Sequence, residues 1–260
     1  MKIQIYQVDA FTDKLFGGNP AGVCPLEEWL PDDIMQKIAM ENNLSETAFF
    51  VDRFNDFEIR WFTPSTEVDL CGHGTLAAAH VIFNHLNYTD KKITFFSKSG
   101  ILGVKKDNGM LFLNFPRDSF EEVPVNNELY KGFGLKPAEA YKGKSDYMLV
   151  YSTQKEIEEI KPDFRLLNEA VARGVIITAK GDKVDFVSRF FAPRSGVLED
   201  PVTGSAHTTL TPYWAEKLGK KELTALQLSK RRGKLKCRLL DDRVEIAGEA
   251  ATYMIGEIEI

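Results

Sequence analysis

The chain has 260 residues, of which 43% are hydrophobic, so it can bury a core large enough for one or two domains. Its formal net charge is −5 and its Lys and Arg residues are scattered, which argues against a nucleic-acid partner and favours a small-molecule substrate. No apolar run approaches the roughly 20 residues that cross a bilayer. The N-terminus alternates like a strand instead of resembling a signal peptide, so we expect a cytoplasmic protein with no membrane partner.

The first elements in chain order are a strand, a loop and a helix. Residues Lys2 to Val8 alternate as a strand does, and Phe11 to Pro20 contains clustered Gly, Asn and Pro that predict a loop. Pro31 then opens a segment with two acids in its first turn and apolar residues at helical spacing, which predicts a helix ending near Asn42 and Asn43.

Two aromatic-rich strands and a second helix follow. Thr47 to Asp52 and Phe57 to Phe62 are short strand candidates, joined by residues 53–56, which suit a hairpin turn. From Thr75 to Leu86 the chain is rich in alanine and apolar at nearly every position. That composition predicts a helix surrounded by protein on all sides.

An internal repeat relates the segment from Phe57 to a second segment from Asp185. The alignment pairs Arg60 with Arg189, Phe62 with Phe191, Val68 with Val197 and Cys71 with Asp200, and after one inserted residue it pairs Gly74-Thr75 with Gly204-Ser205. Both helices are too apolar to lie on a surface, so each half is predicted to wrap its strands around its own helix.

The repeat predicts an α+β fold of two pseudo-symmetric domains. Each would be a mostly antiparallel, β-barrel-like sheet around a central α-helix. The charged, Pro-bounded stretch from Arg117 to Pro124 suggests the boundary, giving domains at residues 1–118 and 119–260, with the last strand as a candidate to return to the first domain.

Two Gly-containing turns open the predicted central helices, at Gly72 to Thr75 and at Gly204 to Ala206. Free N–H groups and the positive end of the helix dipole attract carboxylates at such sites. In a single turn of this kind, glycine often serves only to let the backbone turn into the helix. The recurrence of the turn at matched positions favours a shared substrate site. A carboxylate held by one junction would then complete the site when the other half closes over it.

Glu46 is the leading candidate for a general base because it stands between a helix and an apolar strand. The same position also suits an exposed or capping glutamate. Asp200 could cap the following helix, and His73 could be a satisfied turn histidine. His80, His85 and His207 show no metal-ligand spacing, and the three cysteines Cys24, Cys71 and Cys237 form no CxxC pair. We therefore expect reduced thiols and no bound metal.

The segments VDAFTDKLFGGNPAGV, NLSETAFF, DLCGHGTLAAAHV and SRFFAPRSGVLEDPVTGSAHTTLTPYWAEKLGK, with QLSKRRGKLKCR after them, resemble the signatures of the phenazine-biosynthesis PhzF-like family. The resemblance runs from residue 8 to about residue 238. It implies the diaminopimelate-epimerase fold, a homodimer, and a proton-shifting isomerase that needs no metal or organic cofactor. One departure is Gly74, where many family members carry alanine.

The resemblance also implies roles for residues. The family's proton-moving glutamate falls on Glu46, its cleft histidine on His73 and its cleft aspartate on Asp200. The expected substrate-binding residues are Ser45, Gly72, Gly74, Thr75, Gly204 and Ser205. The substrate is expected to be a small carboxylate.

Two other functions remain open from the sequence. Cys71 occupies the first cysteine position of the related epimerases, so an amino- or hydroxy-acid epimerase is possible. Its repeat partner is Asp200 and not a second thiol. Racemisation by a pair of thiols needs a sulfur on each face of the substrate, so the sequence favours an isomerase over a racemase. Cys71 can equally be a small packing residue. The chain could also be a non-catalytic protein that binds a small carboxylate.

Overall fold

The computed structural model describes residues 1–54, 56–169 and 173–260. Its strands pair mostly antiparallel, as expected for an α+β protein with a large sheet and few helices. The chain divides into two compact units, one made of Met1–Phe115 with Glu245–Ile260 and the other of Pro116–Val244. The C-terminal residues therefore belong to the first unit, and the predicted boundary at residue 118 lies close to the division. Asn55 of the predicted hairpin turn is outside the described residues.

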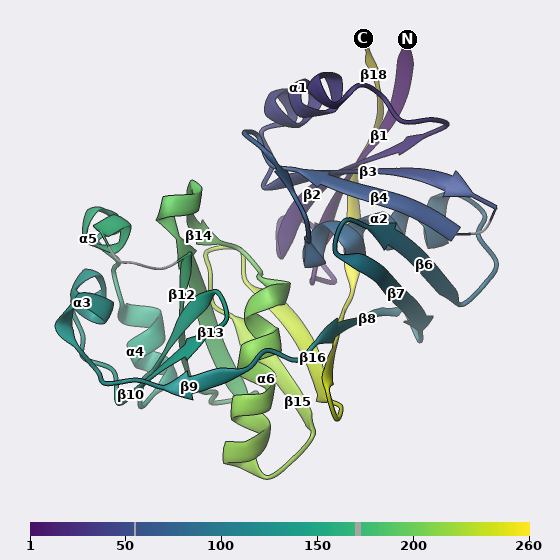
Figure 1. The fold of residues 1–260 in the computed structure, drawn as a ribbon. Helices are drawn as coiled ribbons and strands as arrows, with labels where there is room; N and C mark the ends of the chain where they lie inside the picture. Colours follow the sequence, from purple (N-terminus) through teal and green to yellow (C-terminus); the bar gives the residue numbers. More distant parts are fainter. Residues whose placement is uncertain (55, 170–172) are drawn as a thin grey trace. The chain divides into compact units, whose positions relative to one another are not determined.

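Among its described residues, the first unit contains a sheet and two helices. Its elements are β1 (Lys2–Ala10), β2 (Asn19–Leu26), α1 (Asp32–Asn42), β3 (Glu46–Arg53), β4 (Asp56–Phe62), β5 (Glu67–Val68), α2 (Gly72–His85), β6 (Lys92–Ser97), β7 (Gly100–Asp107), β8 (Met110–Pro116) and β18 (Ala250–Glu259). Strands β1 and β18 pair antiparallel from Lys2 opposite Glu259 onward, so the two chain ends lie side by side (Figure 1). Strand β2 begins at Asn19, so the predicted loop ends earlier than Pro20. A proline is tolerated there because it stands near the strand start.

Helix α2 is the buried centre of the first unit, and it contacts β1, β2 and β3. It begins at Gly72, before the predicted Thr75, and every residue from His73 to Ala79 is buried. Helix α1 instead buries one side, with Met35 and Ile38 packed against Phe49 and Phe62. Among the residues that the structure describes, no helix is both long and apolar enough to span a membrane.

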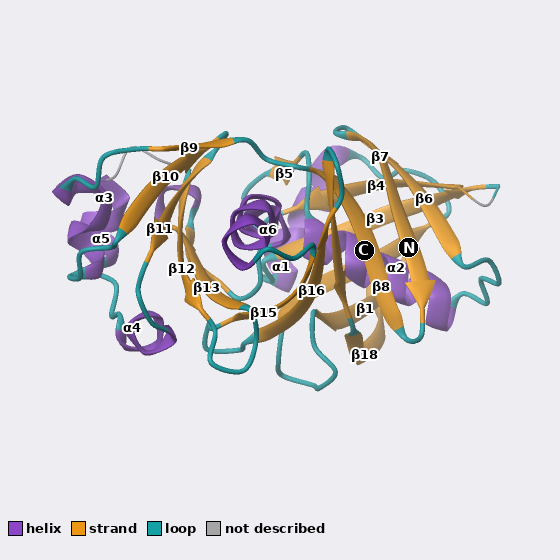
Figure 2. Ribbon diagram, turned by 90° about the horizontal axis from the view of Figure 1, so that it is seen from below, coloured by secondary structure: helices purple, strands orange, loops and turns teal. Residues whose placement is uncertain are grey.

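The second unit is built around α6. Its elements are β9 (Phe120–Glu122), α3 (Asn127–Tyr130), β10 (Glu139–Gly143), β11 (Asp146–Val150), α4 (Gln154–Glu159), α5 (Phe164–Glu169), β12 (Gly174–Lys180), β13 (Phe186–Ala192), β14 (Val197–Asp200), α6 (Gly204–Leu218), β15 (Glu222–Gln227) and β16 (Gly233–Leu239), with β17 (Arg243–Gly248) at the division. Figure 2 shows α6 inside the curve of β12, β13, β15 and β16. Trp214 of α6 stacks on Phe186 of β13, with ring centroids 5.9 Å apart.

The order of strand pairing recurs in the two units. In the first unit β1–β2 and β3–β4 are antiparallel, whereas β2–β3 and β4–β6 are parallel. In the second unit β10–β11 and β12–β13 are antiparallel, whereas β11–β12 and β13–β15 are parallel. Helix α2 lies between β5 and β6 in the chain, and α6 lies between β14 and β15. Both apolar helices thus occupy the same place in the strand order.

Candidate active site

Glu46 and His73 meet in the first unit, at the start of α2. Asn43 ends α1 with a left-handed backbone (φ 48°), a conformation that Asn tolerates, and the chain then enters β3 at Glu46. Glu46 Oε2 lies 2.9 Å from His73 Nε2. The His73 side chain is 6% exposed and that of Glu46 17% exposed. A carboxylate and an imidazole therefore form a largely buried ion pair.

Cys71 caps the same helix. Its backbone is extended, and its Sγ accepts a hydrogen bond from the Gly74 N–H at 3.3 Å. The thiol lies 3.6 Å from His73 Nδ1. Burial raises the pKa of the Cys71 thiol, and the charge of Glu46 raises it further. Burial alone would lower the pKa of His73, but the anionic forms of Cys71 and Glu46 outweigh it and raise that pKa above its usual value.

Asn19 is a third polar neighbour of His73, and the sequence did not single it out. It is fully buried at the start of β2, and its Nδ2 lies 3.2 Å from His73 Nδ1. Strand β2 runs parallel to β3 with Ala21 opposite Glu46, which brings Asn19 to the same end of the sheet. The amide can donate to a bare Nδ1 through its nitrogen or, when turned over, accept from an Nδ1–H through its oxygen. It therefore orients the imidazole in either state.

Three residues here could also hold a metal ion. Glu46, Cys71 and His73 each offer one ligand atom, and these atoms lie within 4.8 Å of one another. Sequence spacing did not reveal this group, because Glu46 is distant along the chain from the other two residues.

Gly74 is required by its packing rather than by its backbone angles. A Cβ at this position would lie 2.8 Å from Trp61 Cδ1 and 3.0 Å from Cys71 Sγ. Trp61 is completely buried in β4, so the indole occupies the volume that a side chain at position 74 would need. This contact accounts for glycine at position 74.

We expect Gly74→Ala to destabilise the chain by about 1 to 3 kcal/mol, since the added methyl group overpacks a filled core. Urea unfolding measures this, and the fluorescence of Trp61 should change as the indole shifts. Gly103→Ala is the matched control, because its Cβ would approach Lys92 Cε only to 3.6 Å. Equal stability of the two variants would contradict the packing explanation.

In the second unit, the corresponding helix start is held by a polar network. Thr203 Oγ1 donates to Asp200 Oδ2 at 2.5 Å. Gln227 Nε2 donates to the Asp200 carbonyl at 2.8 Å, and its Oε1 accepts from the Thr203 N–H at 2.8 Å. Gln227 is fully buried and was not foreseen from the sequence. The exposed Ser205 has its Oγ 3.5 Å from Arg173 Nη2.

The predicted site residues thus fall into two groups. In the first unit, Ser45 and Glu46 lie at the start of β3, and Gly72, His73, Gly74 and Thr75 lie at the start of α2. Asp200, Gly204 and Ser205 lie in the second unit, at the start of α6. Within the first group, the structure brings Glu46 and His73 into direct contact.

His207 follows the second group inside α6. Its Nδ1–H donates to the Thr203 carbonyl at 2.8 Å, while its buried Nε2 has no hydrogen-bond partner among the described residues. Burial lowers the pKa of His207 to about 4. In the unfolded chain the pKa of a histidine is near 6.5. Between that pH and about 4, the unfolded state therefore binds a proton at His207 that the folded state does not bind.

We therefore expect acid to destabilise the chain through His207. This contribution to stability is complete above pH 6.5 and is lost progressively as the pH falls toward 4, by roughly 3 kcal/mol in total. Urea unfolding from pH 7 to pH 4 measures the slope. His207→Asn keeps a donor for the Thr203 carbonyl and removes the titrating group, so its slope should be shallower. An unchanged slope would show that His207 does not cause the acid sensitivity.

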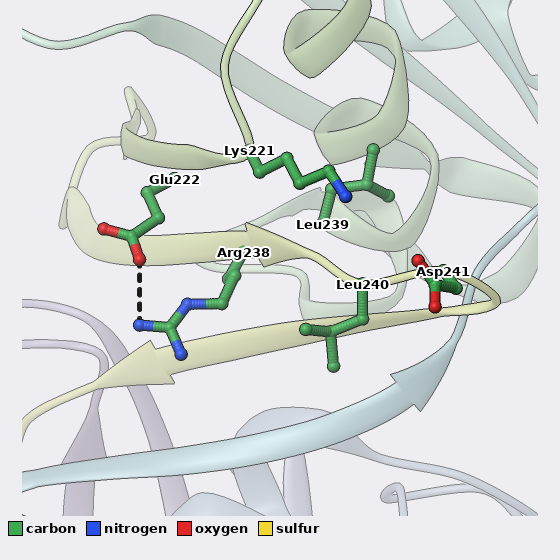
Figure 3. A pocket seen from close by; sticks show the side chains of 6 residues that line it. All are labelled: Lys221, Glu222, Arg238, Leu239, Leu240 and Asp241. Carbon is green, nitrogen blue, oxygen red and sulfur yellow. Dashed lines mark ion pairs between the residues drawn. The ribbon is translucent and has the colours of Figure 1, made fainter.

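The second unit also has a surface pocket. It is lined by Lys221, Glu222, Arg238, Leu239, Leu240 and Asp241, at the paired ends of β15 and β16 (Figure 3). None of its lining residues belongs to the predicted site.

Comparison with known proteins identifies the class. Residues 8–256 match a family model described as phenazine biosynthesis-like protein. An uncharacterized isomerase of Pseudomonas aeruginosa is 48% identical, and another of Halalkalibacterium halodurans is 46% identical, each covering at least 99% of both chains. This chain is accordingly an isomerase.

Solved structures agree with that class. A PhzF-family phenazine biosynthesis protein of Enterococcus faecalis is 45% identical over the whole of both chains, with a TM-score of 0.98. A hydroxyproline epimerase of Agrobacterium vitis is 9% identical with a TM-score of 0.62 over 99% of this chain and 92% of its own, which shows a shared fold alone. The chain belongs to the phenazine biosynthesis-like family, as its sequence signatures predicted.

Proposed function

We propose that this isomerase moves a proton between carbons of a small carboxylate-bearing substrate without a cofactor, with Glu46 as general acid and base. The observation that carries the proposal is the 2.9 Å contact between Glu46 Oε2 and His73 Nε2 at the start of α2. A carboxylate held beside an imidazole and largely removed from water is suited to take up a proton and release it again.

In this mechanism the substrate carboxylate binds the N–H groups of Gly72 and His73, at the positive end of the α2 dipole. Glu46 removes a proton from an activated carbon, and the electron pair left behind is delocalised over the substrate. Glu46 then returns the proton at another carbon. His73, fixed by Asn19, keeps the carboxylate in position throughout.

The proposal extends to the second unit, whose fold we propose to be a pseudo-symmetric copy of the first. The recurring order of strand pairing and the equivalent places of α2 and α6 support this. Asp200 is proposed to assist proton placement, and Gly204 and Ser205 to anchor substrate. The hydrogen bonds from Thr203 and Gln227 that fix Asp200 within its unit are in keeping with such a role.

We also propose that the protein acts as a cytoplasmic homodimer. Cys24, Cys71 and Cys237 are all free and buried, as suits a reducing compartment. Two-fold assemblies are the commonest oligomers. Light scattering in solution would test the dimer.

A screen of small carboxylates in deuterated water tests the reaction itself. A proton-shifting enzyme marks its substrate, because deuterium from solvent enters at the carbon that receives the proton. NMR or mass spectrometry detects this incorporation. An isomerised product that carries no solvent deuterium would argue against exchange through an accessible carboxylic acid.

An epimerase acting through Cys71 is the second candidate, favoured by the 3.6 Å approach of its Sγ to His73. The two functions differ in which variant is inactive. Cys71→Ala should abolish the activity of an epimerase, whereas the proposed isomerase depends on Glu46. The raised pKa of the Cys71 thiol disfavours the thiolate that an epimerase needs.

A further inference from the structure

The order of the strands in the second unit brings Gln227 to the turn that leads into α6. Strand β12 pairs with one edge of β13, and β14 and β15 pair with different parts of the other edge. On that edge Asp200 of β14 lies opposite Phe190, and Gln227 of β15 lies opposite Ser188. The two strands therefore end next to each other, with the Gln227 amide against the turn from Asp200 to Thr203.

The Gln227 amide fits this place in only one orientation. Its Oε1 accepts from the Thr203 N–H at 2.8 Å, and its Nε2 donates to the Asp200 carbonyl at 2.8 Å. A backbone N–H can only donate and a backbone carbonyl can only accept. Turning the amide over would therefore break both hydrogen bonds. The second hydrogen on Nε2 is donated to Thr203 Oγ1, which lies 3.1 Å away.

This orientation of the amide fixes the direction in which the Thr203 hydroxyl donates. Oγ1 accepts from Gln227, and its own hydrogen is donated to Asp200 Oδ2, which lies 2.5 Å away. That distance is in the range of a hydroxyl that donates to a carboxylate. A hydrogen bond to the charged form of an acid favours that form. The chain of hydrogen bonds from Gln227 through Thr203 therefore favours Asp200 as a carboxylate.

The Thr203 hydroxyl is not used to stabilise the helix that follows it. Thr203 is the N-cap residue of α6, a position at which a threonine oxygen commonly accepts from the second or third N–H of the helix. Among the described residues, the Thr203 side chain makes no such capping bond. The side chain of Cys71, by contrast, does cap α2. The hydroxyl at the start of α6 thus serves Asp200 instead of the helix.

We infer that Thr203 and Gln227 are positioning residues that hold Asp200 as a carboxylate in one orientation, an inference that rests on the proposed role of Asp200 in the reaction. Asp200 then begins each turnover as a proton acceptor, with its Oδ2 engaged by Thr203. The rest of the turn is held as well. Ser229 Oγ donates to the Pro201 carbonyl at 2.8 Å, and Val202 is completely buried.

A carbon-13 NMR titration of the Asp200 carboxyl in Thr203→Val tests the hydrogen-bond chain independently of activity. Valine has nearly the shape of threonine without its hydroxyl, and no helix cap is lost with it. We expect the Asp200 carboxyl to titrate about one to two pH units higher than in the wild type, the effect of losing one hydrogen bond to a charged group. Asp200→Asn identifies the signal by its loss. Thr203→Ser keeps a hydroxyl and should restore the wild-type titration.

Thr211→Val is the matched control. Thr211 is another buried threonine of α6, but its Oγ1 donates to the His207 carbonyl within the helix, 2.6 Å away. The Asp200 titration should be unchanged in this variant. His207 itself has a pKa lowered to about 4 by burial, and its effect on the signal is common to the wild type and the variants. If Thr203→Val shifts the titration no more than Thr211→Val does, the inference is wrong.

Gln227→Met is a second variant that decides the matter if Thr203→Val does not fold. It removes the amide that orients the Thr203 hydroxyl, so the Asp200 titration should move in the same direction as in Thr203→Val. A wild-type titration in a folded Gln227→Met chain would contradict the positioning role of Gln227.

The pH dependence of substrate deuterium exchange tests the proposed role of Asp200 separately. In Thr203→Val the acidic limb of the exchange profile should move with the carboxyl titration. A merely structural effect would lower the rate at every pH and leave that limb in place. If the carboxyl titration shifts but Asp200→Asn exchanges as fast as the wild type, the hydrogen-bond chain stands and the proposed role of Asp200 in the reaction is contradicted.

Discussion

Replacing Glu46 by Gln is expected to lower the rate of substrate deuterium exchange by about 10²- to 10⁴-fold, the usual contribution of a positioned acid or base. Glutamine has nearly the same shape as glutamate, so the local structure should persist. What is lost is the group that accepts the proton. The measurement is the exchange rate of a substrate found in the deuterium screen, with near-ultraviolet circular dichroism to confirm folding.

Glu41→Gln is the matched control, because Glu41 is an exposed acid on α1 and its substitution changes the net charge by the same amount. Its exchange rate should equal that of the wild type. Substrate affinity of the Glu46 variant should fall little, since binding is assigned to the helix N–H groups. Full exchange in Glu46→Gln would remove Glu46 from the mechanism, and loss of exchange in Cys71→Ala alone would favour the epimerase.

Local patterns were sufficient to predict the helices and strands that surround the site. The acids and apolar spacing after Pro31 predicted a helix that the structure has at Asp32–Asn42. The alanine-rich run predicted a buried helix, although it begins at Gly72 instead of Thr75. The earlier start has a physical reason, because the Cys71 thiol accepts the Gly74 N–H and so caps the helix before its apolar run.

Contacts between segments distant in the chain could not be predicted in the same way. Asn19 is a single polar residue in a Gly-rich loop pattern, and only the pairing of β1, β2 and β3 brings it to His73. Gln227 looks like an ordinary strand residue until β15 is placed beside β13, near the start of α6. The metal-ligand group likewise depends on the folded position of Glu46. Family resemblance named Glu46 and His73, and the fold supplies the geometry between them.

Arg189 shows how one buried charge can organise several elements of the second unit. It is 9% exposed and forms a two-pronged pair with Glu199, at 2.7 and 3.0 Å. Its remaining Nη1 donates to the carbonyls of Ile157 and Ile160, at 3.1 and 2.8 Å. Those carbonyls lie at the C-terminal end of α4, where a helix leaves acceptors without internal partners. The guanidinium also lies 5.0 Å from the ring centre of Phe191.

Arg189→Ala is therefore expected to destabilise the second unit by about 3 to 5 kcal/mol, the range for breaking a buried ion pair by removing one partner. The Glu199 carboxylate and the two carbonyls would lose their donor in a place with little access to water. Urea unfolding followed by the fluorescence of Trp214, which lies in the same unit, measures the loss. Arg189→Lys should recover only part of it, because a lysine cannot make the two-pronged contact.

The matched control is Arg238→Ala in the same unit. Arg238 pairs with Glu222 at 3.0 Å, but the two side chains are 49% and 76% exposed, and the pair lies at the surface pocket of Figure 3. Exposed pairs contribute about 0 to 1 kcal/mol, so this variant should stay near wild-type stability. If the two alanine variants lose the same stability, burial is not what makes Arg189 important. If Arg189→Ala alone is strongly destabilised, the carbonyl contacts at the end of α4 and the ion pair are both causes. Glu199→Gln keeps those carbonyl contacts, so it should lose less stability than Arg189→Ala.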